Sequence, residues 1–177
     1  MKYKRVARYV RKSSLLILFS LALSSCFRPM YAEMNTAAGS DLRTVLASVS
    51  VEVPKDRIGQ QISNNLSFKF TGGGEAPAPK YRLYLSTHAS SETALVNGLD
   101  LTPKIETTTV ACDFTLADMQ SEKILLRAKV FGRKSYNSSL QRFATVRGQR
   151  GSENGVSETI ADQIQIRLST YFASHAA

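Results

Sequence analysis

Apolar and polar residues alternate along four stretches of the chain, and apolar residues recur at every fourth position along two others. Alternation is typical of a strand, whose successive side chains point to opposite faces, whereas a four-residue spacing marks one face of a helix. The alternating stretches predict strands at about 45–53, 80–88, 105–116 and 123–133. The four-residue stripes predict a helix that carries Ile58, Ile62, Leu66 and Phe70, and a closing helix that carries Val156, Ile160, Ile164, Leu168 and Phe172.

The sequence indicates the start of the first helix more clearly than the start of the closing helix. Pro54 ends the first strand, and the carboxylate of Asp56 is suited to accept hydrogen bonds from the first N–H groups of the helix that follows. Glycines at 148, 151 and 155 precede the closing stripe. Because a glycine inside a helix costs about 1 kcal/mol relative to alanine, the start of the closing helix stays open.

The predicted elements come in the order strand, helix, three strands, helix. Three consecutive strands with short links are expected to form an antiparallel meander, and the first strand must join them through a helical crossover. The order β-α-β-β-β-α therefore predicts an α+β fold, a two-layer sandwich with two helices on one face of a four-stranded mixed sheet.

The alternation also predicts which strand positions face the core. The expected inward residues are Tyr81, Leu83 and Leu85 on the second strand, Val110, Cys112, Phe114 and Leu116 on the third, and Ile124, Leu126, Ala128 and Val130 on the fourth. On this pattern Cys112 is a buried, unpaired thiol that acts as a small apolar residue.

The N-terminal residues follow a different pattern. Six basic residues precede the apolar run at 15–23, which ends in Ser24, Ser25 and Cys26. The run is shorter than the roughly 20 residues that span a bilayer, so residues 1–25 are expected to be a cleaved secretory signal peptide. A cysteine in this position resembles a bacterial lipobox, which predicts acylation of Cys26. The alternative is a plain signal peptide, or a short anchor, with a chance cysteine nearby.

This interpretation sets the expected organisation of the mature protein. Residues 26–43 should form a lipidated tether, and residues 44–177 one α+β domain. The residue after Cys26 is Phe27, not the aspartate that retains enteric lipoproteins at the inner membrane. By resemblance to that sorting rule, the expected location is the periplasmic side of the outer membrane, held in its lipid by acylated Cys26.

The net charge of the chain falls once the expected signal peptide is removed. The chain has 23 basic and 14 acidic residues, a formal charge of +9, but residues 1–25 contain six of the basic residues and none of the acidic ones. The mature chain keeps 17 basic and 14 acidic residues, a charge of +3. Nucleic acid is therefore not expected as a partner.

Several segments together resemble the LptE family of lipopolysaccharide-assembly lipoproteins. They are Cys26–Tyr31, Arg57–Leu66, Tyr81–Leu85, Ser135–Asn137, Phe143–Ala144 and Ile164–Phe172, in the family's order. The resemblance implies a lipoprotein that sits inside the LptD β-barrel of the outer membrane. It also implies that the protein assists barrel assembly and helps deliver lipopolysaccharide to the outer leaflet.

Candidate catalytic chemistry is sparse. His88 and His175 have no His or Cys neighbour at metal-ligand spacing, so no metal site or cofactor is expected. Cys112, His88 and Asp113 could supply a nucleophile and a base, but alternation separates Cys112 from Asp113. We therefore expect no catalytic residues and no enzymatic activity.

The candidate binding residues lie on the outward face of the sheet. Arg127, Lys129 and Arg133 alternate with the core positions of the fourth strand, and Arg82 is expected to share their face. Phosphates accept charge-assisted hydrogen bonds and acyl chains need apolar contacts, so these residues, with Leu125 and Phe131 expected among them on the same face of the fourth strand, suit lipopolysaccharide. The alternative is a solvated or barrel-facing surface.

A second function class stays open. An accessory outer-membrane lipoprotein of a phospholipid-transport system would share the anchor and a small binding domain. Secretin pilotins agree less well, because they tend to be helical repeats or small β domains. The companion recovered from detergent extracts, a large barrel or an inner-membrane transporter, would distinguish the first two classes.

Overall fold

The computed structural model describes residues 41–96, 98 and 103–175. These residues belong to one compact unit, Met34–Ala177. The expected signal peptide at 1–25, the acylation site Cys26 and tether residues 26–40 lie outside the described residues.

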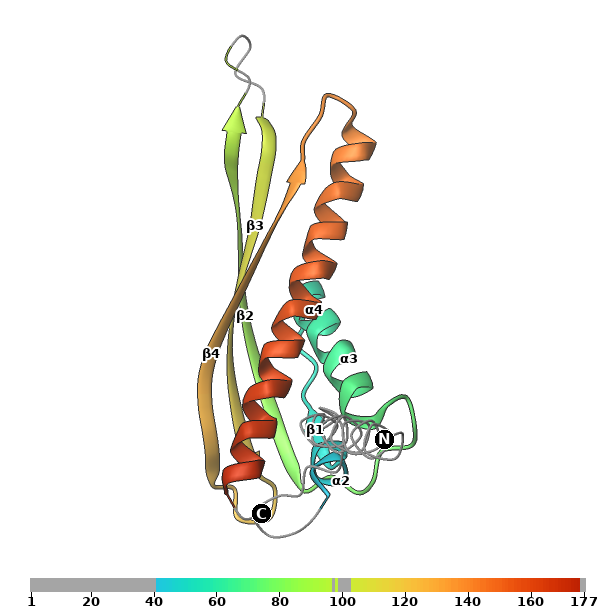
Figure 1. Cartoon of the computed structure of the whole chain (residues 1–177), viewed down its shortest axis with the longest axis vertical. Helices are drawn as coiled ribbons and strands as arrows, with labels where there is room; N and C mark the ends of the chain where they lie inside the picture. The colour runs from blue at the N-terminus through green and yellow to red at the C-terminus, as the bar shows by residue number, and fades with distance from the viewer. Residues whose placement is uncertain (1–40, 97, 99–102, 176–177) are drawn as a thin grey trace, which may run out of the picture. The chain divides into compact units, whose positions relative to one another are not determined.

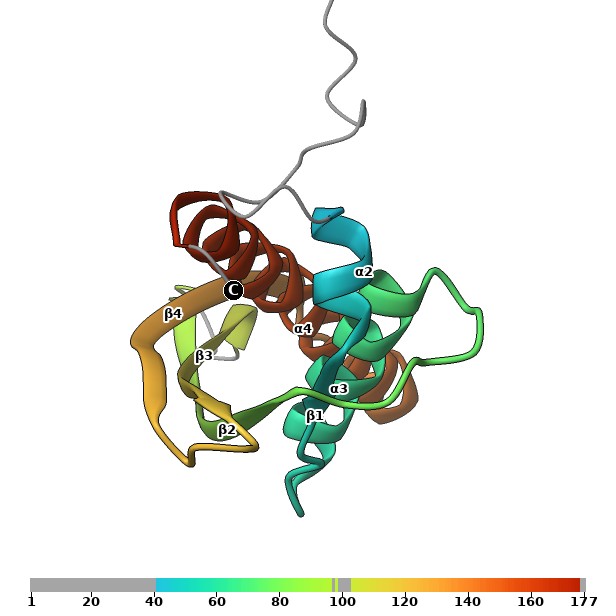
Figure 2. The same cartoon turned by 90° about the horizontal axis from the view of Figure 1, so that it is seen from below.

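Seven elements within the described residues form an α+β fold with a mixed sheet, as the alternation predicted (Figure 1). They are α2 (Leu42–Ala47), β1 (Val49–Val51), α3 (Arg57–Thr71), β2 (Tyr81–Val96), β3 (Pro103–Asp118), β4 (Ile124–Asn137) and α4 (Arg142–Ser174). The sheet order is β1-β2-β3-β4, with β1 parallel to β2 and the other pairs antiparallel. Helices α3 and α4 lie side by side on one face, which is called the inner face below (Figure 2).

The first predicted strand is wrong over its first half. Residues 42–47 form the short helix α2, and only Val49–Val51 pair as a strand. The Asp41 carboxylate accepts a hydrogen bond from the N–H of Arg43, while Leu42 and Leu46 enter the core. A spacing of four between these leucines fits a helix as well as alternation fits a strand, so the short pattern is ambiguous. The first described element thus begins at Leu42, before residue 44, and the described residues contain three helices where two were expected.

The buried face of β3 agrees with the prediction. Val110, Cys112, Phe114 and Leu116 are all fully buried. On β2, Tyr81 and Leu83 are buried and Leu85 is partly buried, also as expected. These side chains pack under Ile62, Leu66 and Phe70 of α3 and the stripe Val156–Phe172 of α4.

The start of β4 departs from the predicted alternation. Leu116 pairs with Leu126, but the next residue, Ala117, pairs with Ile124, so Leu125 is an extra residue in the ladder. A bulge of this kind moves the residues before it to the other face. Ile124, expected in the core, is therefore 50% exposed, whereas Leu125, expected outside, packs partly against the core.

Helix α4 begins at Arg142, well before its apolar stripe. Two of the glycines that left its start open, Gly148 and Gly155, lie where the helix approaches β4, whereas Gly151 has open space beside it. A Cβ on Gly148 would lie 3.2 Å from a ring carbon of Tyr136, and one on Gly132 of β4 would lie 3.3 Å from Val156. Small residues at these positions let the helix and strand pack closely, which offsets the weak helix propensity of glycine.

The two ends of the sheet are called proximal and distal below. The proximal end holds β1, the start of β2 and the turn between β3 and β4; there Tyr81 packs on Phe172, with ring centroids 5.0 Å apart. The distal end holds the last residues of β4 and the start of α4. Helix α3 begins midway along the sheet and runs to the proximal end, with Asp56 as its predicted N-cap, accepting from Gly59 N–H at 2.7 Å (Figure 1).

Candidate functional site

The four predicted binding residues share the outer face of the sheet, away from α3 and α4. Three rows of paired residues cross β2, β3 and β4 on this face. They are Tyr84–Thr115–Arg127, Ser86–Asp113–Lys129 and Ser90–Thr109–Arg133. Arg82 lies one row further toward the proximal end, opposite Ala117. All four cations are exposed. They form, with Tyr84, Ile124 and Phe131, what is called the basic face.

The basic face is extended rather than a single pocket. Arg127 and Arg133 are six residues apart on one strand, which corresponds to about 20 Å at ~3.4 Å per residue. Arg82 lies two strands away from β4, about 10 Å across the sheet. A single phosphate cannot contact all four cations, so a ligand that used the whole face would need several anionic groups.

One cation of the basic face already has a partner. Lys129 Nζ lies 3.3 Å from a carboxylate oxygen of Asp113, its neighbour across β3 and β4. Both side chains are about half exposed, so the pair contributes little to stability. Among the ion pairs between described residues, Arg82, Arg127 and Arg133 take no part. These three arginines are the better candidates for an anionic ligand.

Apolar side chains lie between these cations. Phe131 is 67% exposed and Tyr84 is also exposed. Ile124 joins them because the bulge at Leu125 turns it outward, opposite Ala117 in the row of Arg82. Sequence alternation missed this residue, because a one-residue bulge leaves no periodic signal. Cations with exposed apolar groups between them can contact an amphiphile, although they also suit a polar protein surface.

The possible nucleophile set is kept apart by the sheet. Cys112 is fully buried on the inner face, while His88 and Asp113 belong to the outer face. Burial, and then the nearby Asp113 carboxylate, raise the pKa of Cys112 to about 12, so the thiol stays protonated at neutral pH. Within the described residues, no group of three or more His, Cys, Asp or Glu side chains could hold a metal ion.

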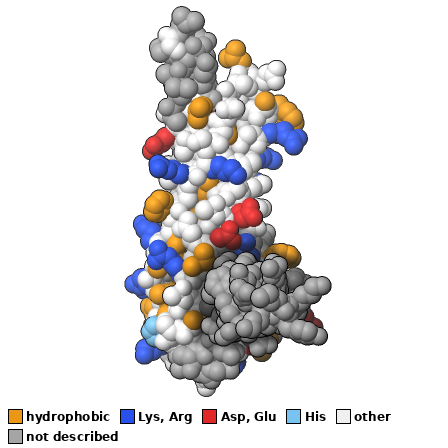
Figure 3. Space-filling view, viewed as in Figure 1, with side chains coloured by type: hydrophobic (Ala, Val, Ile, Leu, Met, Phe, Trp, Pro, Cys, Tyr) orange, Lys and Arg blue, Asp and Glu red, His pale blue; other side chains and the backbone are white. Residues whose placement is uncertain are grey.

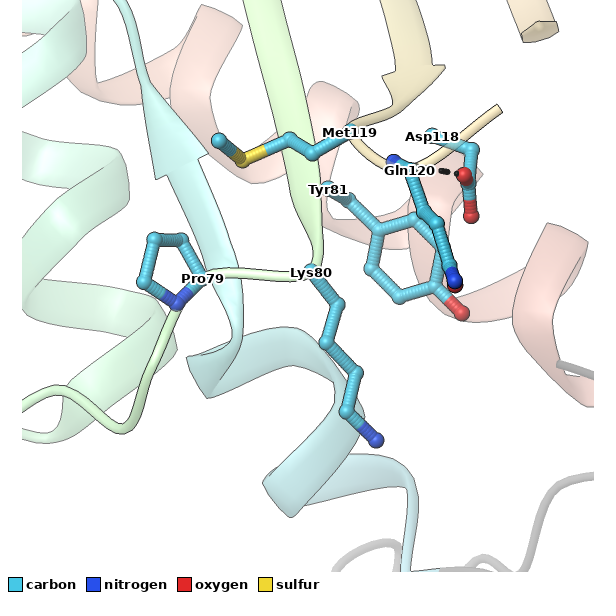
Figure 4. Close-up of a pocket in the computed structure, with 6 residues that line it drawn as sticks. All are labelled: Pro79, Lys80, Tyr81, Asp118, Met119 and Gln120. Atoms are coloured by element: carbon cyan, nitrogen blue, oxygen red, sulfur yellow. Dashed lines mark hydrogen bonds between the residues drawn. The ribbon is translucent and has the colours of Figure 1, made fainter. Parts of the chain in front are cut away.

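A shallow depression of about 500 Å³ lies at the proximal end (Figure 4). It is lined by Pro79, Lys80, Tyr81, Asp118, Met119 and Gln120. The Asp118 carboxylate accepts hydrogen bonds from Ser121 and from the N–H of Gln120, which lower its pKa. Burial raises the pKa of Tyr81. Asp118 thus stabilises the β3–β4 turn, so its carboxylate is engaged within the fold.

Three solved structures are similar to this chain. A candidate lipoprotein from Caulobacter crescentus matches with a TM-score of 0.63 and 21% identity, over 75% of this chain and 95% of the other. Rare lipoprotein B from Shewanella oneidensis matches at 0.51 and 13%, over 69% and 92%. Lipoprotein B from Nitrosomonas europaea, described as uncharacterized, matches at 0.51 and 12%, over 70% and 82%.

No family model and no curated protein matches the sequence. Among the described residues, no helix is long and apolar enough to span a membrane. At identities this low, similarity demonstrates a common fold, and this chain therefore has the α+β fold of these bacterial proteins.

Proposed function

We propose that this protein is a lipid-anchored lipoprotein of the outer membrane that assists an LptD-like β-barrel and the delivery of lipopolysaccharide. The observation that carries the proposal is the fold shared with proteins described as lipoproteins. Because a fold hosts many functions, the N-terminal pattern is needed beside it. Cys26 follows a short apolar run and two serines, as expected for an acylated cysteine.

A barrel partner agrees with the composition of the outer face of the sheet. Beside the cations and the exposed apolar side chains, it carries many small hydroxyl residues, such as Ser86, Ser90, Thr109 and Thr115. The interior of an outer-membrane barrel is polar, so a domain seated there needs a polar surface of this kind. The LptD-like barrel is the proposed partner because segments from Arg57–Leu66 to Ile164–Phe172 resemble the LptE family, whose members sit inside that barrel.

Lipopolysaccharide is the proposed ligand of the basic face. Lipid A combines phosphates with acyl chains, and the basic face combines Arg82, Arg127 and Arg133 with exposed Phe131 and Ile124. Guanidinium groups bind phosphate through paired hydrogen bonds. The extent of about 20 Å along β4 suits a ligand with more than one phosphate.

Depletion and co-purification test the barrel partner. Depleting the protein should lower the amount of correctly assembled barrel and of surface lipopolysaccharide together. The protein, extracted in mild detergent, should carry the barrel with it. If an inner-membrane transporter co-purifies instead, and depletion disturbs phospholipid asymmetry alone, the accessory phospholipid-transport function replaces this proposal.

The anchor is tested separately through Cys26. Cys26→Ala should abolish incorporation of labelled fatty acid and leave the protein unprocessed or released from the membrane fraction. Cys112→Ala is the matched control, because Cys112 is buried in the core and should not be acylated. Equal incorporation of label into wild type and Cys26→Ala would contradict the lipoprotein assignment.

A further inference from the structure

The start of α4 presents an unusual set of exposed apolar side chains at the distal end of the sheet. Leu140 is 90% exposed, Phe143 is 74% exposed and Val146 is 40% exposed. Residues 140–150 are called the distal tip. Figure 3 shows hydrophobic and basic side chains gathered where α4 begins. Exposed apolar groups that lie together, rather than singly, mark an interaction surface.

The distal tip is also strongly cationic. It contains Arg142, Arg147 and Arg150, all exposed, and no acidic residue. The Arg147 guanidinium lies over the ring of Phe143, 5.9 Å from its centroid. Arg142 is the first residue of α4 and lies at the positive end of the helix dipole, where a cation is unfavourable and an anion is stabilised.

The nearest carboxylate along the helix is already engaged. Glu153 pairs with Arg57 of α3 at 2.5 Å and accepts a hydrogen bond from Gln149 at 3.0 Å. Among the ion pairs between described residues, none involves an arginine of the distal tip. The positive charge of the tip is therefore not neutralised within the described part of the fold.

The distal tip is attached to the rest of the fold by contacts of Thr145 and Gly148. Thr145 Oγ1 donates to the carbonyl of Ser139 and accepts from its N–H, both at 3.0 Å. Gly148 packs on Tyr136 of β4. Thr145 and Gly148 therefore belong to the side of α4 that contacts the rest of the fold, whereas Leu140, Phe143 and Val146 remain exposed.

We propose that the distal tip binds the surface of an anionic phospholipid bilayer, with Leu140, Phe143 and Val146 in the headgroup boundary and the three arginines on lipid phosphates. Arginine-rich helices with exposed Phe and Leu bind bilayers in this way. A protein partner would need a complementary shape around each protruding side chain, whereas lipid conforms to a convex tip. This surface is separate from the basic face and does not depend on the proposed lipopolysaccharide contact.

The chain contains no tryptophan, so one introduced indole reports on a single position. F143W places a single indole at the distal tip, and its fluorescence reports contact with lipid whether or not an acyl anchor holds the protein to the vesicle. Full-length protein is mixed with brominated phosphatidylcholine vesicles, with and without phosphatidylglycerol. We expect quenching and a blue shift on the vesicles that contain phosphatidylglycerol and neither on phosphatidylcholine alone.

The charge requirement is tested in the same background. Each basic residue near an anionic surface strengthens binding about fivefold, so R142Q/R147Q/R150Q should weaken the tip's binding roughly a hundredfold and remove the quenching. Added salt should reduce quenching of the parent F143W protein as well, because it screens these contacts.

F68W is the matched control. Phe68 is 66% exposed on α3, outside the distal tip, and Lys69 beside it is paired with Asp162 at 2.6 Å. Its indole should stay unquenched on both vesicles. Equal quenching of F68W and F143W, or no quenching of F143W, overturns the proposal. It is also overturned if F143W responds only to added envelope proteins and never to vesicles, since the tip would then be a protein-docking surface.

Discussion

The proximal and distal halves of the inner face are built from the same three strands, yet they are packed by different means. In the proximal half, rows such as Leu83–Leu116–Leu126 and Leu85–Phe114–Ala128 lie under both α3 and α4. In the distal half the rows become Ser91–Thr108–Lys134 and Thr93–Glu106–Tyr136, and α3 does not reach them (Figure 1). The inner-face rows are therefore apolar where both helices lie over the sheet and polar where α3 is absent.

The distal half is held largely by hydrogen bonds and close backbone approach. The Tyr136 hydroxyl donates to Glu106, and Ser152 of α4 donates to the carbonyl of Lys134 at 2.6 Å. Within the described residues, the buried hydroxyl of Thr108 has no hydrogen-bond partner. Such contacts contribute about 1 kcal/mol each, less than a buried aromatic side chain. Stability is therefore concentrated in the proximal half, while the distal half positions the exposed tip.

Phe114→Ala should produce the largest loss of stability. Phe114 is fully buried in the core cluster that the sheet forms with α3 and α4. Truncating a buried Phe costs about 3–5 kcal/mol, because contacts are lost and a cavity remains. Urea unfolding of the full chain measures the change. Phe131→Ala, on the exposed outer face, is the control and should cost far less. Equal losses in the two variants would contradict a core confined to the inner face.

The burial of Cys112 predicts a dependence of stability on pH. The unfolded thiol loses its proton near pH 9, whereas the folded thiol keeps it up to about pH 12. The folded state therefore binds more protons in this window, and the contribution of Cys112 to the free energy of unfolding falls as pH rises from about 9 to about 12. Wild type should lose stability relative to Cys112→Ala over this range. A constant difference between the two proteins would contradict burial of the thiol.

Thr108→Val should stabilise the protein by about 1 kcal/mol, because it removes a buried hydroxyl that lacks a partner and keeps a similar shape. Thr109→Val is its neighbour on the outer face, where Thr109 is only partly buried, and should change stability by less than about 0.5 kcal/mol. Thermal unfolding of both variants provides the measurement. A destabilised Thr108→Val would mean that water satisfies the hydroxyl, and that the distal half is wetter than its packing indicates.

The smallest effect on folding is expected on the basic face. Replacing Arg82, Arg127, Lys129 and Arg133 together by Gln removes exposed charges, worth roughly 0.2–1 kcal/mol each in binding. Folding should be nearly unchanged, while affinity for purified lipopolysaccharide should fall. If affinity and thermal stability are both unchanged, the basic face is a solvated or barrel-facing surface and lipopolysaccharide must bind elsewhere.

The alternation of apolar residues predicted the buried positions correctly wherever the strands are regular and helices cover them. The buried residues of β3, the Asp56 cap and the shared outward face of the four candidate cations followed from periods of two and four. The errors lie where local pattern is ambiguous or interrupted. Leu42 and Leu46 satisfy a helix within a stretch that also alternates, and the extra residue at Leu125 reverses the faces of the positions before it. At the first site two periods compete over a few residues, and at the second a single extra residue leaves no periodic signal.

The sequence by itself determined most element types, the α+β order and the identity of most core residues, because burial of apolar side chains imposes a period on each long element. Only the tertiary structure decided how far each helix covers the sheet and where α4 begins. Gly148 is tolerated in that helix because Tyr136 lies against it, a contact between separate elements. The exposure of Phe143 and Val146 depends in the same way on the end of β4, since an amphipathic turn is buried only if another layer reaches it.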